Sequence, residues 1–378
     1  DRDFSALLDE GPFTPIAMRP EEPAMFLYTS GSTGRPKGVV LSHYSHLWAI
    51  SQRMRRPVPI GQRSLVAAPL YHMNGLAMSQ TTLSHGDTVV LLPQFTTRGY
   101  VEAAARHRVA FLTSVPTMIA MILRDPDLLA SNDLSAVEAV RMGSAPITQS
   151  LIDQVRKTFP KAQISNGYGT TEAGPVVFGP SPGKSKPDMA LGWPLPGVDV
   201  RLVDAAGRDA DEGVLWQRTP ATMKGYLNLP EKTREVLTED GWYISGDVFR
   251  RDASGAYTFV GRDDDMFNCG GENIYPLEVE GLLLTHPDVA DVSVVPVAHA
   301  VKGEAPVAVV VRRAGSSVGE KAIRDFALAN GPAYAHPRRV FFVDALPLNG
   351  AAKTDRLQVK ALVGRLLGGA ELGRDEAR

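Results

Sequence analysis

Apolar and polar positions alternate in blocks along the first half of this chain. Short apolar runs predict strands at Ala24–Tyr28, Ser64–Leu70, Thr88–Leu92, Phe111–Val115, Val137–Met142 and Ala162–Ser165. Amphipathic stretches between these runs predict helices near Leu76–Ser84, Tyr100–His107, Thr117–Arg124 and Gln149–Phe159. Strands that alternate with helices are typical of βα units, so we expect an α/β fold with a mostly parallel sheet.

The pattern changes beyond Gly197. Up to about Phe259, strand-like runs lie between glycine, aspartate and proline turns, at Val198–Leu202, Gly213–Arg218 and Tyr257–Val260. Such runs predict a small antiparallel or barrel-like β region.

From about Asp265 onward, the pattern predicts a small α+β unit. Helices are predicted near Pro276–Leu284 and Lys321–Leu328, and strands at Val289–Val297, Val307–Val311 and Val340–Val343. Proline suits the first position of a helix, where the backbone N–H has no intrahelical partner. The tail, Gly364–Arg378, is charged and contains glycine, so we expect it to be loosely ordered.

The composition is that of a globular protein with more than one core. The chain has 378 residues, of which 44% are hydrophobic and 22% charged. A net charge of −2 without a long basic run argues against a nucleic-acid partner. The one cysteine, Cys269, excludes an internal disulfide and a metal–thiolate cluster, and suits the reducing cytoplasm. We expect no membrane span, because no apolar run reaches about 18 residues.

A glycine-rich loop follows the first predicted strand, in the stretch FLYTSGSTGRPKGVVLSH (Phe26–His43). Glycines allow close backbone approach, and N–H groups, hydroxyls and a lysine are suitable donors to phosphate oxygens. The spacing is not that of a P-loop, since Arg35 follows Gly34 and Gly38 follows Lys37. The alternative is a flexible Ser/Gly linker, which rarely follows a buried strand. The loop alone therefore indicates a phosphate group, most simply that of a nucleotide.

Four further motifs follow this loop in order. They are NGYGTTEAG (Asn166–Gly174), GWYISGDVFRRD (Gly241–Asp252), GRDDDMFNCGGENIYPLEVE (Gly261–Glu280) and LPLNGAAKTDR (Leu346–Arg356). Each alone could be an ordinary loop, but the whole ordered set is highly specific. Together the motifs resemble the adenylate-forming superfamily, which includes acyl-CoA synthetases, peptide-synthetase adenylation domains and firefly-type luciferases. The resemblance covers essentially the whole chain.

The resemblance implies an AMP-forming acyl-CoA synthetase, an acid–thiol ligase of the fatty acid or aryl acid type. A carboxylate attacks the α-phosphate of ATP, giving acyl-AMP and pyrophosphate, and CoA then displaces AMP. ATP, CoA and a small carboxylic acid are the implied substrates, Mg²⁺ the implied cofactor and fatty acid metabolism the implied setting. In family members a sizeable segment precedes the glycine-rich loop, which begins at Thr29 here, so we expect this chain to lack that segment.

The implied architecture has a large AMP-binding domain at residues 1–263 and a small mobile C-terminal domain at residues 265–378. Asp264 is the implied hinge between them, where a residue absorbs a large backbone rotation. The alternative interpretation of the acidic triple Asp263–Asp265 is a solvated turn.

By this resemblance, several segments bind the nucleotide. The loop residues Thr29, Ser30, Gly31, Ser32, Thr33 and Gly34 clamp the β- and γ-phosphates, and Lys37 adds charge unless it is merely solvated. Thr171 contacts the α-phosphate, and Glu172 holds Mg²⁺, a hard ion that prefers oxygen ligands. Tyr168 lies against adenine or, alternatively, packs in the core. The remaining implied nucleotide contacts are Gly143, Ser144, Ala145, Asn166, Gly167, Gly169 and Thr170.

Asp247 and Arg262 are implied to bind the ribose. A carboxylate accepts hydrogen bonds from both ribose hydroxyls, and Arg262 would reach the same hydroxyls from the next motif. Alternatively, the two opposite charges merely pair with one another.

Lys353 is the implied catalytic lysine. An ammonium there bridges the substrate carboxylate and the α-phosphate and stabilises the charge as the new bond forms. The chain departs from the family pattern at Ala352, where glycine is usual. The alternative is a surface lysine in front of a terminal helix.

The acceptor and acyl sides follow from the same resemblance. After domain rotation the GGEN loop, with Gly270, Gly271 and Glu272, shapes the thiol tunnel, and the neighbouring Cys269 is expected to serve packing. His72 in PLYHMNG is the implied gate on the acyl side, or alternatively a core histidine. The implied pocket walls, suited to medium or long aliphatic or aryl acids, are Met73, Met142, Asn166, Gly174 and Val176.

Two other functions stay open at this point. One is a stand-alone adenylation domain that loads a carrier protein, although GGENIYPLEVE looks more like acyl-CoA ligases. The other is a fragment that binds nucleotide without turnover.

Overall fold

The computed structural model describes residues 11–12, 14–29, 36–54, 60–145, 147–349, 353–368 and 372. The first half of the chain forms a five-stranded sheet with the order β4-β3-β5-β6-β7, and all four strand pairs are parallel. A second, three-stranded sheet has the order β1-β2-β12. The elements of this half are β1 (Pro23–Thr29), β2 (Lys37–Ser42), α1 (His43–Met54), β3 (Arg63–Val66), α2 (Met73–Ser84), β4 (Thr88–Leu91), α3 (Thr97–Arg106), β5 (Phe111–Ser114), α4 (Pro116–Leu123), α5 (Pro126–Ala130), β6 (Ala139–Gly143), α6 (Gln149–Thr158) and β7 (Gln163–Gly167).

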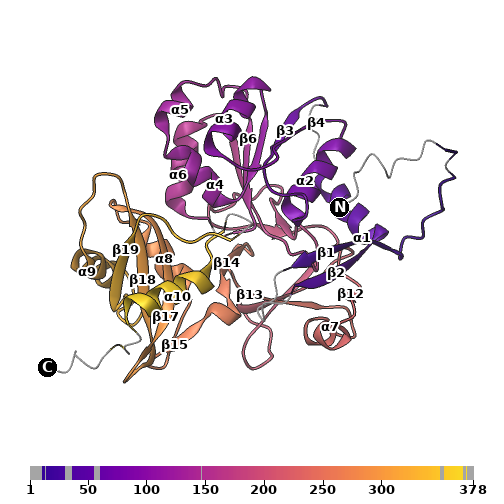
Figure 1. The fold of residues 1–378 in the computed structure, drawn as a ribbon. Helices are drawn as coiled ribbons and strands as arrows, with labels where there is room; N and C mark the ends of the chain where they lie inside the picture. Colours follow the sequence, from indigo (N-terminus) through magenta and orange to yellow (C-terminus); the bar gives the residue numbers. More distant parts are fainter. Residues whose placement is uncertain are drawn as a thin grey trace.

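The helices α3, α4, α5 and α6 lie together beside the parallel sheet (Figure 1). Their apolar faces and the sheet enclose one core, in which Leu65, Ile119 and Val140 are almost completely buried. Thr96 and Thr148 cap α3 and α6 by accepting hydrogen bonds from backbone N–H groups in the first turn, and α4 begins with Pro116. The predicted α/β pattern is thereby confirmed for this half.

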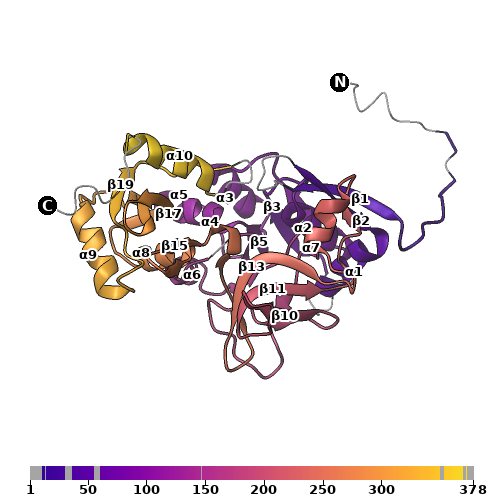
Figure 2. The ribbon, with the colours of Figure 1, turned by 90° about the horizontal axis from the view of Figure 1, so that it is seen from below.

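The middle of the chain forms the expected antiparallel β region, an open four-stranded sheet with the order β10-β11-β13-β14. Figure 2 shows β10, β11 and β13 of this sheet lying beside one another. The elements of the middle region are β8 (Phe178–Gly179), β9 (Trp193–Pro194), β10 (Asp199–Val203), β11 (Glu212–Arg218), β12 (Gly225–Tyr226), α7 (Pro230–Val236), β13 (Tyr243–Arg251) and β14 (Tyr257–Arg262).

The last part of the chain forms the expected α+β unit. Its sheet has the order β16-β15-β18-β17, and β19 pairs with β18 in parallel. Its elements are the 3₁₀ turn η2 (Asp263–Asp265), β15 (Phe267–Cys269), β16 (Glu272–Ile274), α8 (Pro276–Leu283), β17 (Val289–His299), β18 (Gly303–Arg312), α9 (Glu320–Asn330), β19 (Arg339–Val343) and α10 (Arg356–Leu366).

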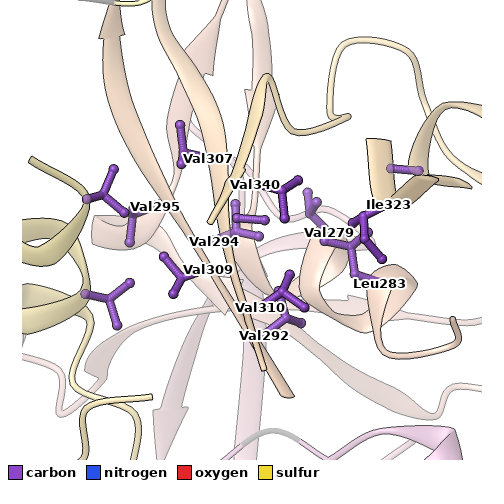
Figure 3. Close-up of a cluster of buried hydrophobic side chains, with 14 of the residues drawn as sticks. Val279, Leu283, Val292, Val294, Val295, Val307, Val309, Val310, Ile323 and Val340 are labelled. Carbon is purple, nitrogen blue, oxygen red and sulfur yellow. The ribbon is translucent and has the colours of Figure 1, made fainter. Parts of the chain in front are cut away.

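A core rich in valine holds this C-terminal unit together. Figure 3 shows Val292 of β17 and Val310 of β18 on the same side of the sheet as Val279 and Leu283 of α8 and Ile323 of α9. Val295, Val307 and Val309 lie on the opposite face of the sheet. Runs of β-branched residues suit a strand that is covered on both faces. In β18, the seven residues from Ala305 to Val311 are all buried.

Among the described residues, Arg124 and Arg250 contact the C-terminal unit from the rest of the chain. Arg124, at the end of α4, donates to the carbonyl of Ala290 at 3.2 Å and lies 3.8 Å from the carboxylate of Asp291. Arg250 of β13 lies 3.4 Å from Glu278 of α8. The C-terminal unit is thus seated against both the helical layer and the antiparallel sheet.

Some predicted boundaries differ from the structure. The strand predicted at Ser64–Leu70 ends at Val66, because the chain turns at Pro69, whose carbonyl accepts from the N–H of His72 at 3.0 Å. The tail was expected to be loosely ordered from Gly364. Within the described part of this tail, α10 continues to Leu366, and Leu372 is buried with its backbone bonded to Ala298 and Ala300. Residues 369–371 and 373–378 lie outside the described residues. The described helices are all too short or too polar to cross a lipid bilayer.

Candidate active site

The candidate site begins at the carboxyl ends of two neighbouring parallel strands. In an open α/β sheet, ligands bind in the crevice beyond these ends. β6 ends at Gly143 and β7 at Gly167, and the two glycines are partners in the strand register, as are Met142 and Asn166. A β-carbon on Gly143 would lie 3.0 Å from the carbonyl oxygen of Gly167, so a side chain there would push the two segments apart.

The turn after β6 has an unusual backbone conformation. Ser144 has φ of 64°, a left-handed value that residues other than glycine rarely adopt. Its hydroxyl accepts a hydrogen bond from Asn74 at 3.3 Å, which links this turn to the start of α2. Ala145 follows within the same bend, and Pro146 lies outside the described residues.

The segment after β7 folds back on itself in a tight turn. The backbone groups of Thr170 and Gly174 bond to one another in both directions at 3.0 and 3.1 Å. The Thr170 hydroxyl accepts from the N–H of Ala173 at 3.0 Å, which fixes the turn internally. Gly169 has no room for a side chain, since a β-carbon would lie 2.3 Å from the carbonyl carbon of Pro175. The tight turn orients Thr171 and Glu172.

Asp247 and Arg262 pair across neighbouring strands. They are register partners of β13 and β14, and Arg262 Nη1 lies 3.0 Å from Asp247 Oδ1. The other carboxylate oxygen accepts from the phenol of Tyr168. Burial raises the pKa of Asp247, while Arg262 and Tyr168 oppose that rise by stabilising the charged carboxylate. Asp247 and Arg262 thus form an ion pair in this structure, on a carboxylate that is only 6% exposed.

Tyr168 packs in the core, as one of its two interpretations predicts, and it also contacts Asp247. Its ring packs edge-on against Phe249 with centroids 4.8 Å apart, and it also contacts Phe178 and Phe259. Burial and the neighbouring Asp247 charge raise the pKa of Tyr168 well above its ordinary value, so the phenol stays protonated and donates. Tyr168 thus joins the aromatic core to the Asp247 carboxylate.

The expected hinge residue is attached to the same arginine. Arg262 Nε donates to Asp264 Oδ1 at 2.9 Å, and Nη2 donates to Oδ2 at 3.3 Å. Burial disfavours the charged guanidinium, but Asp264 and Asp247 outweigh burial and raise the pKa of Arg262. One guanidinium therefore holds Asp247 with one edge and the η2 turn with another.

Glu172 lies on a second polar chain in the site. It is 8% exposed, and its Oε1 accepts from the phenol of Tyr226 at 3.0 Å. The Tyr226 hydroxyl in turn accepts from Lys37 Nζ at 3.2 Å, and this ammonium lies 4.4 Å from the centroid of the ring. Burial and the Glu172 charge raise the pKa of Tyr226. The phenol therefore stays protonated and donates its proton to the hydrogen bond with Glu172.

Thr29 and Lys37 mark the two ends of the glycine-rich loop. They are paired residues in the antiparallel register of β1 and β2, so the loop connects two hydrogen-bonded strands. The Thr29 hydroxyl is buried and has no hydrogen-bond partner among the described residues. An unpaired buried hydroxyl is costly unless a ligand or water satisfies it. The predicted clamp residues Ser30, Gly31, Ser32, Thr33 and Gly34 lie outside the described residues.

Lys353 comes from the C-terminal unit, and its charge interacts with those of Asp247 and His72. Burial lowers the pKa of Lys353, and the Asp247 charge partly opposes this change. Burial also lowers the pKa of His72, with a contribution from the Lys353 charge, so His72 is neutral near pH 7. The backbone of Lys353 is fixed on both sides. Asn349 N donates to the Lys353 carbonyl at 2.8 Å, and Lys353 N donates to Asn349 Oδ1 at 3.2 Å.

A small cavity lies beside Thr171. Its lining includes Met73 and Gly174, two of the expected acyl-pocket residues, together with Leu41, His46 and Ala221. Asn166 lies at the end of β7, and Val176 is half-buried near the turn. Met142 is instead completely buried in the core between the parallel sheet and its helices. The structure thus separates Met142 from the cavity that Met73 and Gly174 share.

The expected thiol-tunnel residues form the hairpin between β15 and β16. Gly270 and Gly271 have φ of 65° and 98°, which glycine adopts without strain, and Glu272 begins β16. All three residues are exposed in this conformation. Cys269 is 2% exposed in the core of the C-terminal unit, as the packing interpretation predicted.

The carboxylate of Glu172 fits a magnesium ion that is bound mainly by substrate. The described residues contain no group of three or more histidine, cysteine, aspartate or glutamate side chains that could form a protein-only metal site. Mg²⁺ is commonly held by one or two carboxylates plus the phosphates of a nucleotide. Glu172 Oε2 has no hydrogen-bond partner among the described residues, whereas Oε1 is occupied by Tyr226.

Tyr226 and His46 were not predicted from the sequence. Tyr226 lies in a Gly-Tyr pair before α7, a pattern that carries no chemical signal by itself. His46 is paired with Gln80 at 2.5 Å, an interaction between α1 and α2. Only the strand pairing of β12 with β2 brings Tyr226 beside Lys37.

Comparison with known proteins identifies two matching family regions. The sequence model described as "AMP-binding enzyme" matches residues 3–227, and that of the "AMP-binding enzyme C-terminal domain" matches residues 278–353. Among curated proteins, 4-coumarate–CoA ligase 2 of Oryza sativa subsp. japonica is 33% identical over 377 residues, or 95% of this chain. The chain spans 65% of the length of that relative.

Solved structures give the same result. ATP-bound MatB from Rhodopseudomonas palustris has a TM-score of 0.86 and 29% identity, covering 94% of this chain and 71% of that one. The amide bond synthetase McbA from Marinactinospora thermotolerans has a TM-score of 0.83 and 31% identity, covering 94% and 72%. The family match spans more than half of the chain, and the fold agrees with it. This chain therefore belongs to the AMP-binding enzyme family, within the adenylate-forming superfamily that its motifs resemble.

Proposed function

We propose that this protein activates a carboxylic acid with ATP to form acyl-AMP and pyrophosphate, and then transfers the acyl group to CoA. The observation that carries the proposal is the set of contacts that holds the buried Asp247 carboxylate between Arg262 and Tyr168, at the start of the segment that also carries Glu172. The charge of Lys353, from the C-terminal unit, interacts with that of Asp247, which supports a part for this lysine in the first half-reaction.

Each group has a distinct part in this proposal. Asp247 and Arg262 bind the ribose hydroxyls, and Tyr168 holds the Asp247 carboxylate from the other side. Lys353 stabilises the negative charge that develops as the carboxylate attacks the α-phosphate. Glu172 would hold a magnesium ion, which when bound neutralises charge on the phosphates.

Lys353 is partly buried, and this position suits its proposed part. An ammonium in a site that excludes water interacts more strongly with phosphate oxygens than a solvated one does. Neutral His72 beside it would border the acid without adding a second positive charge.

The names of the relatives favour an aryl acid over a fatty acid as the substrate, since the first curated relatives are 4-coumarate–CoA ligases. The similarity to the amide bond synthetase McbA supports a second acceptor, an amine in place of the CoA thiol. A carrier protein is the third acceptor to compare. Supplying acyl-AMP with CoA, with an amine or with a carrier protein separates these alternatives.

Separate assays of the two half-reactions test the proposal. Lys353→Ala should slow acyl-AMP formation by about 10²–10³, as expected for loss of one electrostatic donor at a reacting oxyanion. The same variant should convert pre-formed acyl-AMP and CoA into thioester at a near-normal rate, since the C-terminal unit rotates between the steps. Lys360→Ala, an exposed lysine of the adjoining α10, is the matched control and should change neither step.

The hinge gives the opposite expectation. Asp264→Pro fixes φ and restricts rotation, so acyl-AMP should still form while thioester formation fails. Equal loss of both steps in the Lys353 and Asp264 variants would contradict the proposed domain rotation. Stoichiometric release of ADP instead of AMP would contradict the proposed reaction itself.

A further inference from the structure

The contact chain Lys37–Tyr226–Glu172 joins two expected ligand-binding groups through a residue with no assigned role. Lys37 Nζ donates to the Tyr226 hydroxyl at 3.2 Å, and this hydroxyl donates to Glu172 Oε1 at 3.0 Å. The three residues come from three different segments, namely the start of β2, the strand β12 and the turn after β7. The phenol therefore satisfies a cation and an anion at the same time.

The ring of Tyr226 is held firmly in place. The residue is 5% exposed and packs with Val39, Leu41 and Met223 in one apolar cluster. Its backbone N–H donates to the Thr233 hydroxyl at 2.9 Å, and its strand pairs with β2. The phenolic oxygen consequently has a fixed position beside the Glu172 carboxylate.

The backbone of Glu172 is held by the segment that leads into Tyr226. Its carbonyl accepts from the N–H of Met223 at 2.6 Å, three residues before Tyr226. One side-chain oxygen is occupied by the phenol, and the described residues provide no hydrogen bond to the other oxygen. The carboxylate is thus oriented with Oε2 unoccupied.

The phenol also separates two opposite charges. The described residues show no direct ion pair between Lys37 and Glu172, because the hydroxyl lies between them. A direct pair would neutralise both groups and commit the carboxylate to the ammonium. With the hydroxyl between them, the carboxylate stays available to a divalent cation and the ammonium to phosphate oxygens.

We propose that Tyr226 is a positioning residue that orients Glu172 toward a nucleotide-bound divalent cation and keeps Lys37 from pairing with that carboxylate. This inference rests on the proposed function, since it presumes that the site binds ATP with a metal ion. Outer partners of a metal-binding carboxylate typically contribute about 10- to 100-fold to metal affinity.

The test measures ATP binding to the full chain by isothermal titration, without the carboxylic acid so that no reaction occurs. The dissociation constant is determined once in EDTA and once with saturating Mg²⁺, and their ratio is the metal-dependent gain in affinity. In Tyr226→Phe this gain should fall about 10-fold or more, and ATP affinity in EDTA should fall by much less than affinity with Mg²⁺, since only Lys37 acts without the metal. Tyr243→Phe is the matched control, since Tyr243 is a buried tyrosine of the same cluster whose hydroxyl is not bonded to Glu172. It should retain the full gain.

A second variant keeps the test decisive if Tyr226→Phe folds poorly. Glu172→Gln should lose the metal-dependent gain but not ATP binding in EDTA, and adding Tyr226→Phe to it should cause no further loss, because the two residues act through one carboxylate. Lys37→Met should instead weaken ATP binding in both conditions.

Two results would overturn the inference. One is a wild-type metal-dependent gain in Tyr226→Phe, and the other is an equal loss of affinity with and without metal. A wild-type chain that binds no ATP would instead contradict the proposed function, so the two failures are distinguishable.

Discussion

Replacing Arg356 with methionine removes the partner of a deeply buried carboxylate. Arg356 holds Glu280 with two hydrogen bonds of 2.8 Å each and donates to the Val294 carbonyl at 2.9 Å. The side chains are 24% and 9% exposed, and a third group, Asp265 of η2, lies 3.5 Å from Arg356 Nε. The guanidinium thus joins α10, which follows the Lys353 segment, to α8, β17 and the expected hinge.

The expected loss of stability follows from the unpaired Glu280 charge that the substitution leaves in the core. Removing one member of a buried ion pair costs about 3–5 kcal/mol in the free energy of unfolding. Glu280 keeps one hydrogen bond, from the N–H of Val294 at 2.7 Å, and Arg356 is partly accessible. We therefore expect a loss near the lower end, about 3 kcal/mol, at neutral pH.

The loss should depend on pH with a defined sign. Burial raises the pKa of Glu280 above its unfolded value, and Arg356 opposes this rise, so the variant should have a still higher folded pKa. A raised carboxyl pKa causes no penalty below the unfolded pKa; the penalty grows as pH increases from the unfolded toward the folded pKa and is constant above the folded pKa. Destabilisation should therefore be smaller at pH 5 than at pH 8.

Equilibrium urea unfolding of the full chain measures these values at both pH values. The control is Lys321→Met, which breaks the exposed pair with Asp325 on α9 and should change stability by less than about 0.5 kcal/mol. The double variant Glu280→Leu with Arg356→Met should recover at least half of the loss, since no unpaired charge remains. A loss in Arg356→Met below about 1 kcal/mol, equal at both pH values, would refute the reasoning.

Three further predictions concern the site. Asp247→Ala should weaken ATP binding, since each charge-assisted hydrogen bond to the ribose contributes about 1.5–3 kcal/mol; unchanged affinity by titration would exclude the ribose assignment. Gly169→Ala should lower the unfolding temperature and abolish acyl-AMP formation, because the new β-carbon would lie 2.3 Å from Pro175. The control Gly281→Ala in α8 meets no atom within 4 Å and should leave stability unchanged or raise it. Because burial lowers the pKa of Lys353, the rate of acyl-AMP formation should decline on the alkaline side at a lower pH than an ordinary lysine predicts, and Lys353→Arg should move that decline upward in the pH–rate profile.

The sequence by itself determined the fold class and the motif positions of this protein. Periodicity located the strands and helices of the parallel sheet, since period 2 and period 3.6 place apolar residues on a single face. Pro276 marked one helix start, because the first turn needs no N–H donor. The glycine-rich loop and the four motifs sufficed to recognise the superfamily, and the family comparison confirmed it.

Only the tertiary structure decided which of these residues meet. Tyr226 lies 189 residues from Lys37 in the sequence, and they bond because β12 pairs with β2. Met142 looked like a pocket residue but faces the core, since side chains on neighbouring strand positions point to opposite faces of the sheet. The electrostatic interaction of Lys353 with Asp247 depends on how the C-terminal unit is seated, through contacts such as Arg124 with Asp291. Long-range pairing of this kind leaves no local pattern in the sequence, because each partner alone is compatible with many surroundings.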